Sequence, residues 1–335
     1  MSGTSLDGLD MVICTFWKQK DKWQYRIEKA TTIAYSGEWR IKLHNAFHAG
    51  AYEITLLDRE YGRWIGRQAA QFMKGIKVDF IASHGHTVFH RPDQKCTLQI
   101  GHAAAIVAET GLPVVSDFRS LDVALGGQGA PLVPVGDELL FSGYDYCLNL
   151  GGFANISCRK NEQRTAWDIC PVNIILNKLA PPFDKDGRLG KKGECYLPLR
   201  EELDALEFYQ RTPPKSLGRE WLENIFEKIL ETYPLSLEDK LSTLYDHIAH
   251  QITKSIDPPG NVLVTGGGAW NTFLLEKLKS KSNSTFILPD EITVNFKEAL
   301  VFAFLGLLRI NSETNCLASV TGASRDSSSG TITHL

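Results

Sequence analysis

Met1-Ser2-Gly3-Thr4-Ser5-Leu6-Asp7-Gly8-Leu9-Asp10 is the stretch of this sequence that decides the fold. It combines two glycines, three hydroxyls and two carboxylates, and residues 11–16 after it form an apolar, β-branched run that predicts a strand. Because glycine tolerates positive φ, such a loop can turn its backbone N–H groups toward an anion. An ordinary Gly/Asp hairpin turn is the alternative, and no Gly-Lys-Ser/Thr follows, which excludes a Walker A loop.

The composition is that of an ordinary globular protein. With 335 residues, 43% hydrophobic and 22% charged, the chain is long enough for two domains or one large one. A net charge of −3 lacks the basic surplus of nucleic-acid binders. We find no apolar run of the roughly 18–20 residues that a membrane span needs, and the first residues lack the charged start of a secretory signal.

Seven cysteines are scattered through the chain without a C-x-x-C pair. An odd, dispersed set indicates free thiols in a reducing cytoplasm, with neither a disulfide framework nor a zinc site.

Strand-like and helix-like segments alternate along the chain, which predicts an α/β fold. The predicted strands are 11–16, 23–32, 79–83, 146–150, 153–157 and 261–265. The predicted helices are 37–49, 54–75, 103–110, 167–180, 237–256, 271–279 and 296–308. Residues 319–330 are rich in Ser and Gly and have little helical tendency.

Two further glycine turns follow strands, at Gly151-Gly152 and at Gly266-Gly267-Gly268. The strand–Gly-Gly–strand unit at 146–157 echoes the N-terminal segment and suggests a distant internal duplication. The triple glycine joins a buried-type strand to a helix, where a backbone can approach a phosphate closely. Taken together, the three turns favour a two-lobed ATPase of the actin/Hsp70/hexokinase type.

Histidines gather where the strand at 79–83 ends: His84, His86 and His90, with His102 nearby. Ligands bind at the carboxyl ends of strands in open α/β sheets. A metal site lacks a neighbouring carboxylate or cysteine, so we expect a substrate-binding loop of His84, His86 and Thr87.

Two other sets of charged residues leave alternatives open. Arg119 could grip a carboxylate bidentately or form an internal salt bridge with Asp117 and Asp122. Lys215 and Arg219 could line a ligand site or be solvated charges. From the residues alone, Asp168 in the first turn of the helix at 167–180 is best interpreted as a helix cap.

Over its whole length the chain resembles one family, the anhydro-N-acetylmuramic acid kinases. The matching motifs are Met1-Ser2-Gly3-Thr4-Ser5-Leu6-Asp7-Gly8, Ser83-His84-Gly85-His86-Thr87, Asp117-Phe118-Arg119, the glycine-rich 126–134, Asn149-Leu150-Gly151-Gly152, 214–220, Gly266-Gly267-Gly268 with Asn271, and Val320-Thr321-Gly322-Ala323.

The resemblance implies a two-lobed actin-like ATPase (ribonuclease H-like) fold with a central cleft between the lobes. It places lobe I at 1–116 plus about 305–335 and lobe II at 117–304. It implies a cytoplasmic, homodimeric kinase of peptidoglycan recycling that uses ATP and Mg²⁺. Its substrate would be anhydro-N-acetylmuramic acid, a small amino sugar, and its product N-acetylmuramic acid 6-phosphate. It implies neither a nucleic-acid nor a membrane partner.

The resemblance also implies roles for individual residues. Asp168 matches the catalytic base, which we expect to stay ionised beside a helix start, and Glu298 matches an acid near the attacking water. The nucleotide-binding residues implied are Gly3, Thr4, Ser5, Leu6, Asp7, Gly8, Leu9, Asp10, Gly151, Gly152, Asn155, Gly266, Gly267, Gly268 and Asn271. Substrate would contact His84, His86, Thr87, Arg119 and Asn173, and Asp7 would hold Mg²⁺ through water.

The chain departs from the family pattern at Cys170, Asn177 and His86, which puts substrate affinity or fine specificity in doubt. The family has a strand before the first motif, so either the sequence is shortened there, which we expect, or the protein is compromised at its phosphate hairpin. Two alternatives stay open: a kinase for a sugar with a free hydroxyl, and a silent sugar- or nucleotide-binding regulator.

Overall fold

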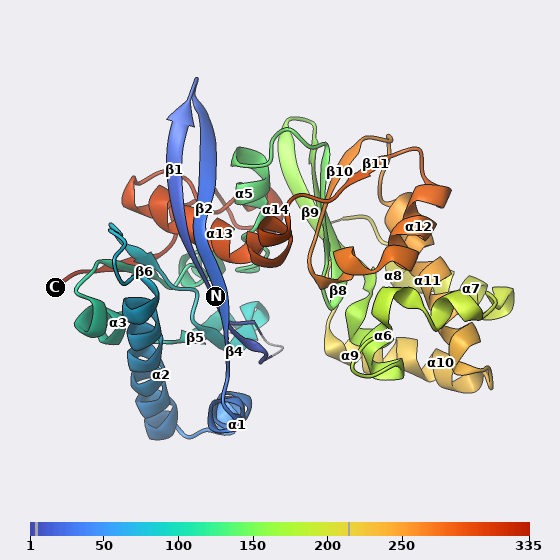
Figure 1. The fold of residues 1–335 in the computed structure, drawn as a ribbon, viewed down its shortest axis with the longest axis horizontal. Helices are drawn as coiled ribbons and strands as arrows, with labels where there is room; N and C mark the ends of the chain where they lie inside the picture. The colour runs from blue at the N-terminus through green and yellow to red at the C-terminus, as the bar shows by residue number, and fades with distance from the viewer. Residues whose placement is uncertain (4–5, 214) are drawn as a thin grey trace. The chain divides into compact units, whose positions relative to one another are not determined.

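The computed structural model describes residues 1–3, 6–213 and 215–335, which divide into two compact units (Figure 1). Unit 1 comprises Met1–Leu140 and Phe296–Leu335, and unit 2 comprises Phe141–Asn295. Both mix strands and helices, so the predicted α/β class is confirmed.

The unit boundaries differ from the lobe boundaries that we expected at 116/117 and 304/305. Residues 117–140 stay with unit 1 because their buried contacts run to the C-terminal segment. Thr321 Oγ1 donates to Asp122 Oδ1 at 2.7 Å, and Gln128 N donates to the Thr321 carbonyl at 2.8 Å. The second boundary falls inside one continuous helix, α13 (Glu291–Ile310).

Unit 1 is built on a long antiparallel hairpin, β1 (Gly8–Gln19) with β2 (Lys22–Ala34), drawn in blue in Figure 1. A three-stranded sheet has the order β12-β6-β3, and β4 pairs with β5 in a second hairpin. These strands are β3 (Ile81–Ala82), β4 (His86–Arg91), β5 (Cys96–Ile100), β6 (Val114–Ser116) and β12 (Thr331–Thr333). The helices are α1 (Gly37–Asn45), α2 (Ala51–Phe72), α3 (Ala103–Thr110), α4 (Ser120–Ala124), α5 (Pro134–Leu139) and α14 (Ala318–Thr321), with short 3₁₀ helices at Ala46–His48 and Pro92–Gln94.

The C-terminal segment contains more regular structure than its composition predicted. Residues 318–321 form α14, and β12 pairs antiparallel with β6. Arg309 Nε on α13 donates to the Gly330 carbonyl at 2.7 Å and ties this strand to the helix. Long-range pairing therefore orders a tail that has little intrinsic preference.

Unit 2 contains a five-stranded sheet of order β11-β10-β7-β8-β9. Its strands are β7 (Tyr146–Leu150), β8 (Phe153–Lys160), β9 (Gln163–Pro171), β10 (Asn261–Thr265) and β11 (Thr285–Ile287). Strands β7, β8 and β9 form an antiparallel meander, and β10 runs parallel to β7 and β11. The predicted strand–Gly-Gly–strand unit is confirmed.

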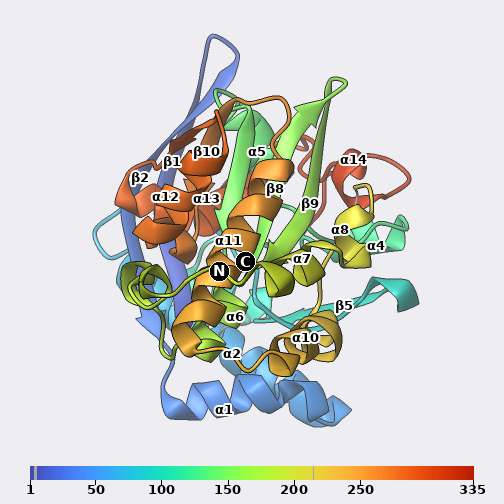
Figure 2. The ribbon, with the colours of Figure 1, turned by 90° about the vertical axis from the view of Figure 1, so that its right-hand side faces the viewer.

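Helices cover the sheet of unit 2. They are α6 (Asn173–Leu179), α7 (Leu197–Asp204), α8 (Glu207–Gln210), α9 (Arg219–Trp221), α10 (Glu227–Thr232), α11 (Leu237–Lys254) and α12 (Thr272–Lys281), with 3₁₀ helices at Lys185–Gly187, Gly190–Lys192 and Gly267–Trp270 and a π-helical turn at Leu222–Phe226. The amphipathic α11 lies along one face of the sheet and contacts β9 (Figure 2). Its buried leucines and isoleucines join the apolar side chains of β7, β8 and β10 in one core.

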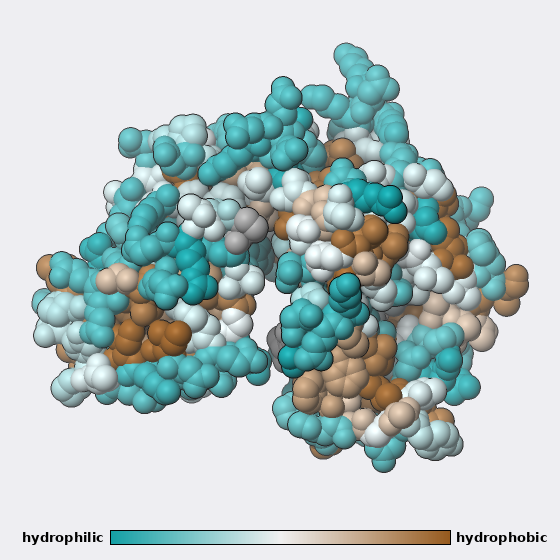
Figure 3. Space-filling model, turned by 180° about the vertical axis from the view of Figure 1, so that it is seen from behind, coloured by the Kyte–Doolittle hydropathy of each residue, from teal (hydrophilic) through white to brown (hydrophobic). Residues whose placement is uncertain are grey.

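On the face shown in Figure 3, polar residues predominate, with apolar areas between them. No helix in the described ranges is both long and apolar enough to span a bilayer.

Candidate active site

The N-terminal loop is closed by main-chain pairing on either side of the glycine-containing turn. Ser2 forms an antiparallel bridge with Leu9, and Asp10 N donates to the Met1 carbonyl at 2.9 Å. Leu6 N donates to the Gly3 carbonyl at 3.4 Å, and Leu6 has a φ of 58°. The predicted contacts of Thr4 and Ser5 lie outside the described residues.

The end of the predicted loop is strand, because β1 begins at Gly8 and not after Asp10. A Cβ on Gly8 would lie 2.6 Å from the Ile33 carbonyl oxygen, so this glycine is needed for close packing on β2. Leu9 is only 3% exposed and belongs to the core of unit 1. The predicted nucleotide contact at Leu9 would therefore have to be made by its backbone, and it stays a prediction. Asp10 accepts from Thr32 Oγ1 at 2.5 Å, and Asp7 is exposed.

A buried hydroxyl chain supports this loop. Tyr35 Oη donates to Ser2 Oγ at 2.7 Å and also contacts Tyr61 Oη, while Ser2 Oγ lies 3.1 Å from His86 Nδ1. The Ser2 hydroxyl accepts from Tyr35 and shares a second hydrogen bond with His86 Nδ1, in which the His86 tautomer decides which group donates. Burial lowers the pKa of His86 to about 4, so the ring is neutral at pH 7. His86 thus supports the loop through Nδ1.

His84, predicted to bind substrate, contacts protein groups at both ring nitrogens. Its Nδ1 lies 3.0 Å from the Gly85 carbonyl, and its Nε2 accepts from Arg119 Nε at 3.1 Å and Nη2 at 2.9 Å. Arg119 Nη1 also donates to the Gly129 carbonyl at 2.6 Å. No salt bridge from Arg119 to Asp117 or Asp122 is present among the described residues, and both carboxylates accept from other groups.

Asp122 is a key buried residue that the sequence did not single out for this role. Its carboxylate is 1% exposed and accepts from Thr321 Oγ1 at 2.7 Å, Cys316 Sγ at 3.0 Å and Gly129 N at 2.7 Å. It joins the glycine-rich 126–134 motif to the 320–323 motif. The sequence offered one indication of this link: the 126–134 and 320–323 segments both match family motifs, although neither resembles a ligand site.

Helix α13 brings Glu298 to the same unit as Arg119. The Glu298 side chain is partly exposed to solvent. Its pKa is nevertheless raised, because the effect of the surrounding protein, which excludes water from the carboxylate, is larger than the opposing effect of the Arg119 charge. One turn further on, the Phe302 ring lies 4.6 Å from the His84 ring. No direct ion pair joins Glu298 to Arg119 in the described part of the chain.

In unit 2, two glycine turns and Asn173 converge around Leu150. Asn173 Nδ2 donates to the Leu150 carbonyl at 3.0 Å, and its backbone N donates to the Gly151 carbonyl at 3.2 Å. A Cβ on Gly268 would lie 2.8 Å from Leu150 Cβ. Gly266 has a φ of 85°, and a Cβ there would lie 2.5 Å from Asn149 Oδ1. These close approaches require glycine.

Asn271, predicted to bind nucleotide, has both ends of its amide occupied by the protein. Its Oδ1 accepts from Leu274 N at 3.1 Å as the N-cap of α12, and its Nδ2 donates to Tyr245 Oη at 2.8 Å. Tyr245 Oη in turn donates to Asp184 Oδ2 at 3.2 Å. The side chain therefore fixes the glycine turn to the helix that follows.

Asp168 lies within β9, not in the first turn of a helix; α6 begins only at Asn173. Our expectation of a helix from residue 167 is wrong because cross-strand pairing with β8 extends to Pro171. Asn149, Asn155 and Asp168 are partners across β7, β8 and β9, and cross-strand partners share one face of a sheet. Two amides and one carboxylate therefore lie in a row.

The Asp168 carboxylate is half-buried, and burial raises its pKa although the Leu217 N–H bond lowers it. This is opposite to the direction that a helix start would give. Leu217 N donates to Oδ2 at 2.8 Å, and Asp168 N donates to the Lys215 carbonyl at 3.0 Å. No described residue donates to Oδ1. The carboxylate is thus fixed by one oxygen and available at the other.

Lys215 anchors the loop that holds Asp168. Its Nζ donates to the Phe208 carbonyl at 3.1 Å and lies 4.7 Å from the centre of the Phe208 ring. Arg219, by contrast, is exposed at the start of α9. The sequence left the role of Lys215 open, and the structure gives it an internal anchoring contact.

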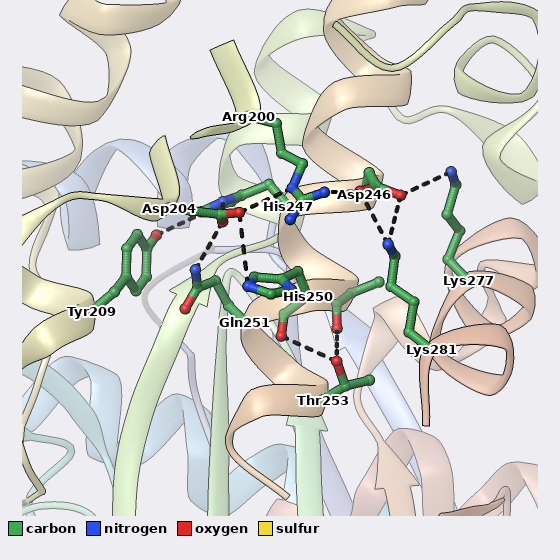
Figure 4. A network of polar contacts seen from close by, with 11 residues as sticks. Arg200, Asp204, Tyr209, Asp246, His247, His250, Gln251, Thr253, Lys277 and Lys281 are labelled. Atoms are coloured by element: carbon green, nitrogen blue, oxygen red, sulfur yellow. Dashed lines mark hydrogen bonds and ion pairs between the residues drawn. The ribbon is translucent and has the colours of Figure 1, made fainter. Parts of the chain in front are cut away.

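Tyr209, which follows Phe208 in the sequence, belongs to a buried polar network joining α7, α8, α11 and α12 (Figure 4). His247 lies 3.0 Å from Tyr209 Oη through Nε2 and 2.6 Å from Asp204 Oδ1 through Nδ1. Burial alone would raise the pKa of Asp204, but hydrogen bonds from His247, Gln251 and Arg200 outweigh it and hold that pKa well below its usual range. The network fixes the base of the Lys215 loop.

Within the described ranges, no group of three or more His, Cys, Asp or Glu side chains could hold a metal ion. The histidines at 84, 86, 90 and 102 instead have separate partners: Arg119, Ser2, Thr97 and Ala104 N.

A model of the family described as anhydro-N-acetylmuramic acid kinase matches residues 1–335. The chain belongs to this family. Relatives named anhydro-N-acetylmuramic acid kinase include one from Sulfurimonas denitrificans, 31% identical over 363 residues that cover 99% of this chain and 97% of the relative. Another, from Acinetobacter baylyi, is 33% identical over 374 residues with the same coverage of both chains. The chain is therefore an ATP-using kinase of the family that serves cell wall recycling.

Solved structures similar to the kinase are more distant. A ROK family glucokinase from Streptomyces griseus, in complex with glucose and AMPPNP, is 12% identical with a TM-score of 0.39 and covers 87% of this chain and 97% of its own. The activator of the 2-hydroxyisocaproyl-CoA dehydratase from Clostridium difficile, with bound ADPNP, is 15% identical with a TM-score of 0.32 and covers 54% of this chain and 67% of its own.

Proposed function

We propose that this kinase opens the 1,6-anhydro ring of anhydro-N-acetylmuramic acid and phosphorylates O6, giving N-acetylmuramic acid 6-phosphate and ADP. Family membership over the whole chain supports the substrate. The observation that carries the mechanism is the Asp168 carboxylate, held at Oδ2 by the Leu217 N–H with Oδ1 free of described donors.

The chemistry requires one base and one phosphoryl donor. Because O6 of the substrate is bonded to C1, it carries no proton for a base to remove. Water attacks C1, its proton passes to Oδ1 of Asp168, and the C1–O6 bond breaks. The electron pair of that bond stays on O6, which takes the γ-phosphoryl group as ADP leaves. A raised pKa suits a carboxylate that must accept a proton near neutral pH.

The glycine turns are proposed to hold the nucleotide. In unit 1 the turn around Gly3 and Leu6, with the exposed Asp7, would face phosphate oxygens. In unit 2 the backbone at Gly151, Gly152 and 266–268 would do so, with Asn155 beside Asp168. Phosphoryl transfer depends mainly on positioning and charge neutralisation, which backbone N–H groups supply without a mobile side chain.

The carboxylates of unit 1 suit Mg²⁺, which prefers oxygen ligands and is usually bound by one or two carboxylates plus substrate phosphates. Asp7 is exposed, and the pKa of Glu298 is raised mainly by burial, with a smaller contribution from the charge of Asp10. We propose that Asp7, with Asp10, holds Mg²⁺ through water. When bound, the ion would neutralise charge on the transferring phosphoryl group.

The sugar is proposed to contact Thr87, Asn173 and Arg119, with Glu298 positioning the attacking water. His86 contributes through the ring edge not used by Ser2. Cys170 is fully buried two residues after Asp168 on β9, and burial raises the pKa of its thiol well above its usual value. As a neutral side chain packed in the core of unit 2 it adds no charge near the base, so this departure from the family pattern is compatible with turnover.

The kinase is proposed to act in the cytoplasm as a homodimer. All seven cysteines are free thiols in the structure, as in proteins of reducing compartments. Light scattering coupled to gel filtration tests the dimer: a mass of one chain would contradict it.

Mass spectrometry of the product tests the reaction. Incubation with Mg-ATP and the anhydro sugar should give a product heavier by one water and one phosphoryl group, lost in Asp168→Asn. In ¹⁸O-labelled water the label should appear on C1. A product heavier by a phosphoryl group alone would refute ring opening, and bound ATP without any product would refute the kinase mechanism.

A further inference from the structure

His84 lies in the motif expected to contact the sugar, yet its hydrogen-bonding capacity is used within the protein. Nδ1 faces the Gly85 carbonyl at 3.0 Å, and Nε2 accepts two N–H groups of Arg119. An imidazole has one proton when neutral, so the Gly85 carbonyl requires it on Nδ1 and Arg119 requires a lone pair on Nε2. The two contacts are satisfied only by this neutral tautomer.

The environment fixes the ring in that form. His84 is 5% exposed and packs against the Phe302 ring of α13 at 4.6 Å. Burial, together with the charge of Arg119, holds the pKa of His84 well below its usual value. The ring is therefore a permanent acceptor at neutral pH.

Arg119 is fixed from two directions. Nε and Nη2 donate to His84, and Nη1 donates to the Gly129 carbonyl, whose own N–H donates to the buried Asp122. A guanidinium has five N–H groups, so two have no acceptor among the described residues. With Glu298 not directly paired to it, Arg119 presents a charged, preorganised pair of donors.

We propose that His84 is a positioning residue that orients Arg119 so that its two remaining N–H groups bind an oxyanion of the substrates. This inference rests on the proposed function. Carboxylate and phosphoryl oxygens share the chemistry that a guanidinium recognises, and the sugar and ATP respectively supply them. His84 itself touches neither.

A matched pair of variants separates positioning from packing. In His84→Gln the side-chain oxygen reaches the place of Nε2 and can accept from Arg119, whereas in His84→Asn the shorter side chain cannot. We expect kcat/KM to fall by about 100-fold in His84→Asn, as for a misplaced binding group, and most of that loss to be recovered in His84→Gln. Equal losses in both variants would overturn the proposal.

A double-mutant cycle with Arg119→Met tests whether His84 acts through Arg119. If it does, adding His84→Asn to Arg119→Met has no further effect on kcat/KM; multiplied losses would overturn it. Thermal unfolding of each variant identifies those that fail to fold. Arg119→Lys, which keeps the positive charge but lacks the planar set of N–H groups of a guanidinium, is a second, independent test. We expect Arg119→Lys to lose as much activity as His84→Asn, and near-wild-type activity would contradict the proposal.

The source of the oxyanion is read from binding. Calorimetric titration with AMPPNP and with anhydro-N-acetylmuramic acid, run separately, shows which ligand His84→Asn weakens. The double-mutant cycle of His84→Asn and Arg119→Met can be measured by these titrations as well, because binding needs no turnover. If the wild type proved inactive, the proposed function would be refuted, but the binding cycle would still test the role of His84. Unchanged affinity for both ligands together with unchanged kcat would refute the positioning role.

Discussion

At the scale of single residues, Asp168 is a carboxylate whose burial opposes its charge. The Leu217 N–H offsets part of this cost at Oδ2, and the remainder raises the pKa. A group whose pKa is higher in the folded state than in the unfolded state stabilises the protein at low pH and loses that contribution as the pH rises through the folded pKa. At neutral pH the ionised Asp168 therefore costs stability.

We predict that Asp168→Asn lowers kcat by about 10³-fold or more and increases the free energy of unfolding at pH 7. An amide keeps an acceptor for Leu217 N and carries no charge to bury. Urea denaturation should show a stability difference that shrinks as the pH falls below the raised pKa. The exposed Glu231→Gln is the control, and an Asp168→Asn variant less stable than wild type at pH 7 would contradict the prediction.

Asp122 gives the opposite case, a carboxylate that stabilises the fold. We predict that Asp122→Ala lowers the free energy of unfolding by at least about 3 kcal/mol, because it leaves the buried donors of Cys316 and Gly129 without an acceptor and removes the shorter hydrogen bond of Thr321. Asp93→Ala, which removes an exposed partner of Arg91, should change little. Urea midpoints measure both, and similar midpoints for the two variants would refute this role.

At the scale of elements, the turn after β10 contains two neighbouring glycines with different roles: Gly266 is required by the backbone geometry, whereas Gly267 has room for a side chain. A Cβ on Gly266 meets Asn149 Oδ1 at 2.5 Å and the backbone has a φ of 85°, whereas a Cβ on Gly267 has its nearest neighbour, Asn173 Nδ2, at 3.9 Å. We predict that Gly266→Ala costs about 1–3 kcal/mol of stability, and that Gly267→Ala leaves stability unchanged.

Nucleotide binding gives the same pair a second readout. If the backbone here approaches phosphate, Gly267→Ala raises KM for ATP while its melting temperature stays that of the wild type. A Gly267→Ala variant with unchanged KM would remove this turn from the proposed nucleotide site.

Burial raises the pKa of Asp168, and the Lys215 loop opposes this rise through the Leu217 N–H bond. We predict that Lys215→Met frees the loop from Phe208, weakens the Leu217 N–H bond and raises the pKa of Asp168 further. The acidic limb of the kcat/KM profile should then move to higher pH. Lys178→Met, which removes an exposed ion pair with Glu227 in the same unit, is the control. A lower kcat with an unmoved limb would indicate a different role for the loop.

Elements with strong local signals were predictable from the sequence, and those made by long-range pairing were not. Helices α3 and α11 follow their apolar periodicity, and the strand–Gly-Gly–strand unit follows its composition. Asp168 and Pro171 favour a helix start locally, but β8 pairs with this segment and keeps it extended. β12 likewise exists only because β6 lies beside it.

The same distinction applies to the site. The glycine turns were visible because their chemistry is local. The contacts of Asp168 with Leu217, of His84 with Arg119 and of Asp122 with Thr321 join residues far apart in the sequence. Composition cannot pair them, so His84 was expected to touch sugar, and the support of Asp168 by the Lys215 loop was not foreseen.

At the scale of the whole molecule, unit 2 is continuous in sequence and contains its own core, from Tyr146 to Val294. We predict that a fragment of residues 141–295 folds alone and unfolds cooperatively in urea, whereas residues 1–140 do not, because β6 lacks β12 and unit 1 lacks most of α13. Circular dichroism of the two fragments measures this, and a cooperative transition for residues 1–140 would contradict it.

The pairing of β12 with β6 also has a consequence for synthesis on the ribosome. Domains usually fold in the order in which they emerge, but unit 1 needs residues 296–335, which are translated after the whole of unit 2. Unit 2 is complete while the first 140 residues still await their partner strand. During translation those residues expose apolar surface, so chaperones should bind the nascent N-terminal part for longer than they bind the middle of the chain.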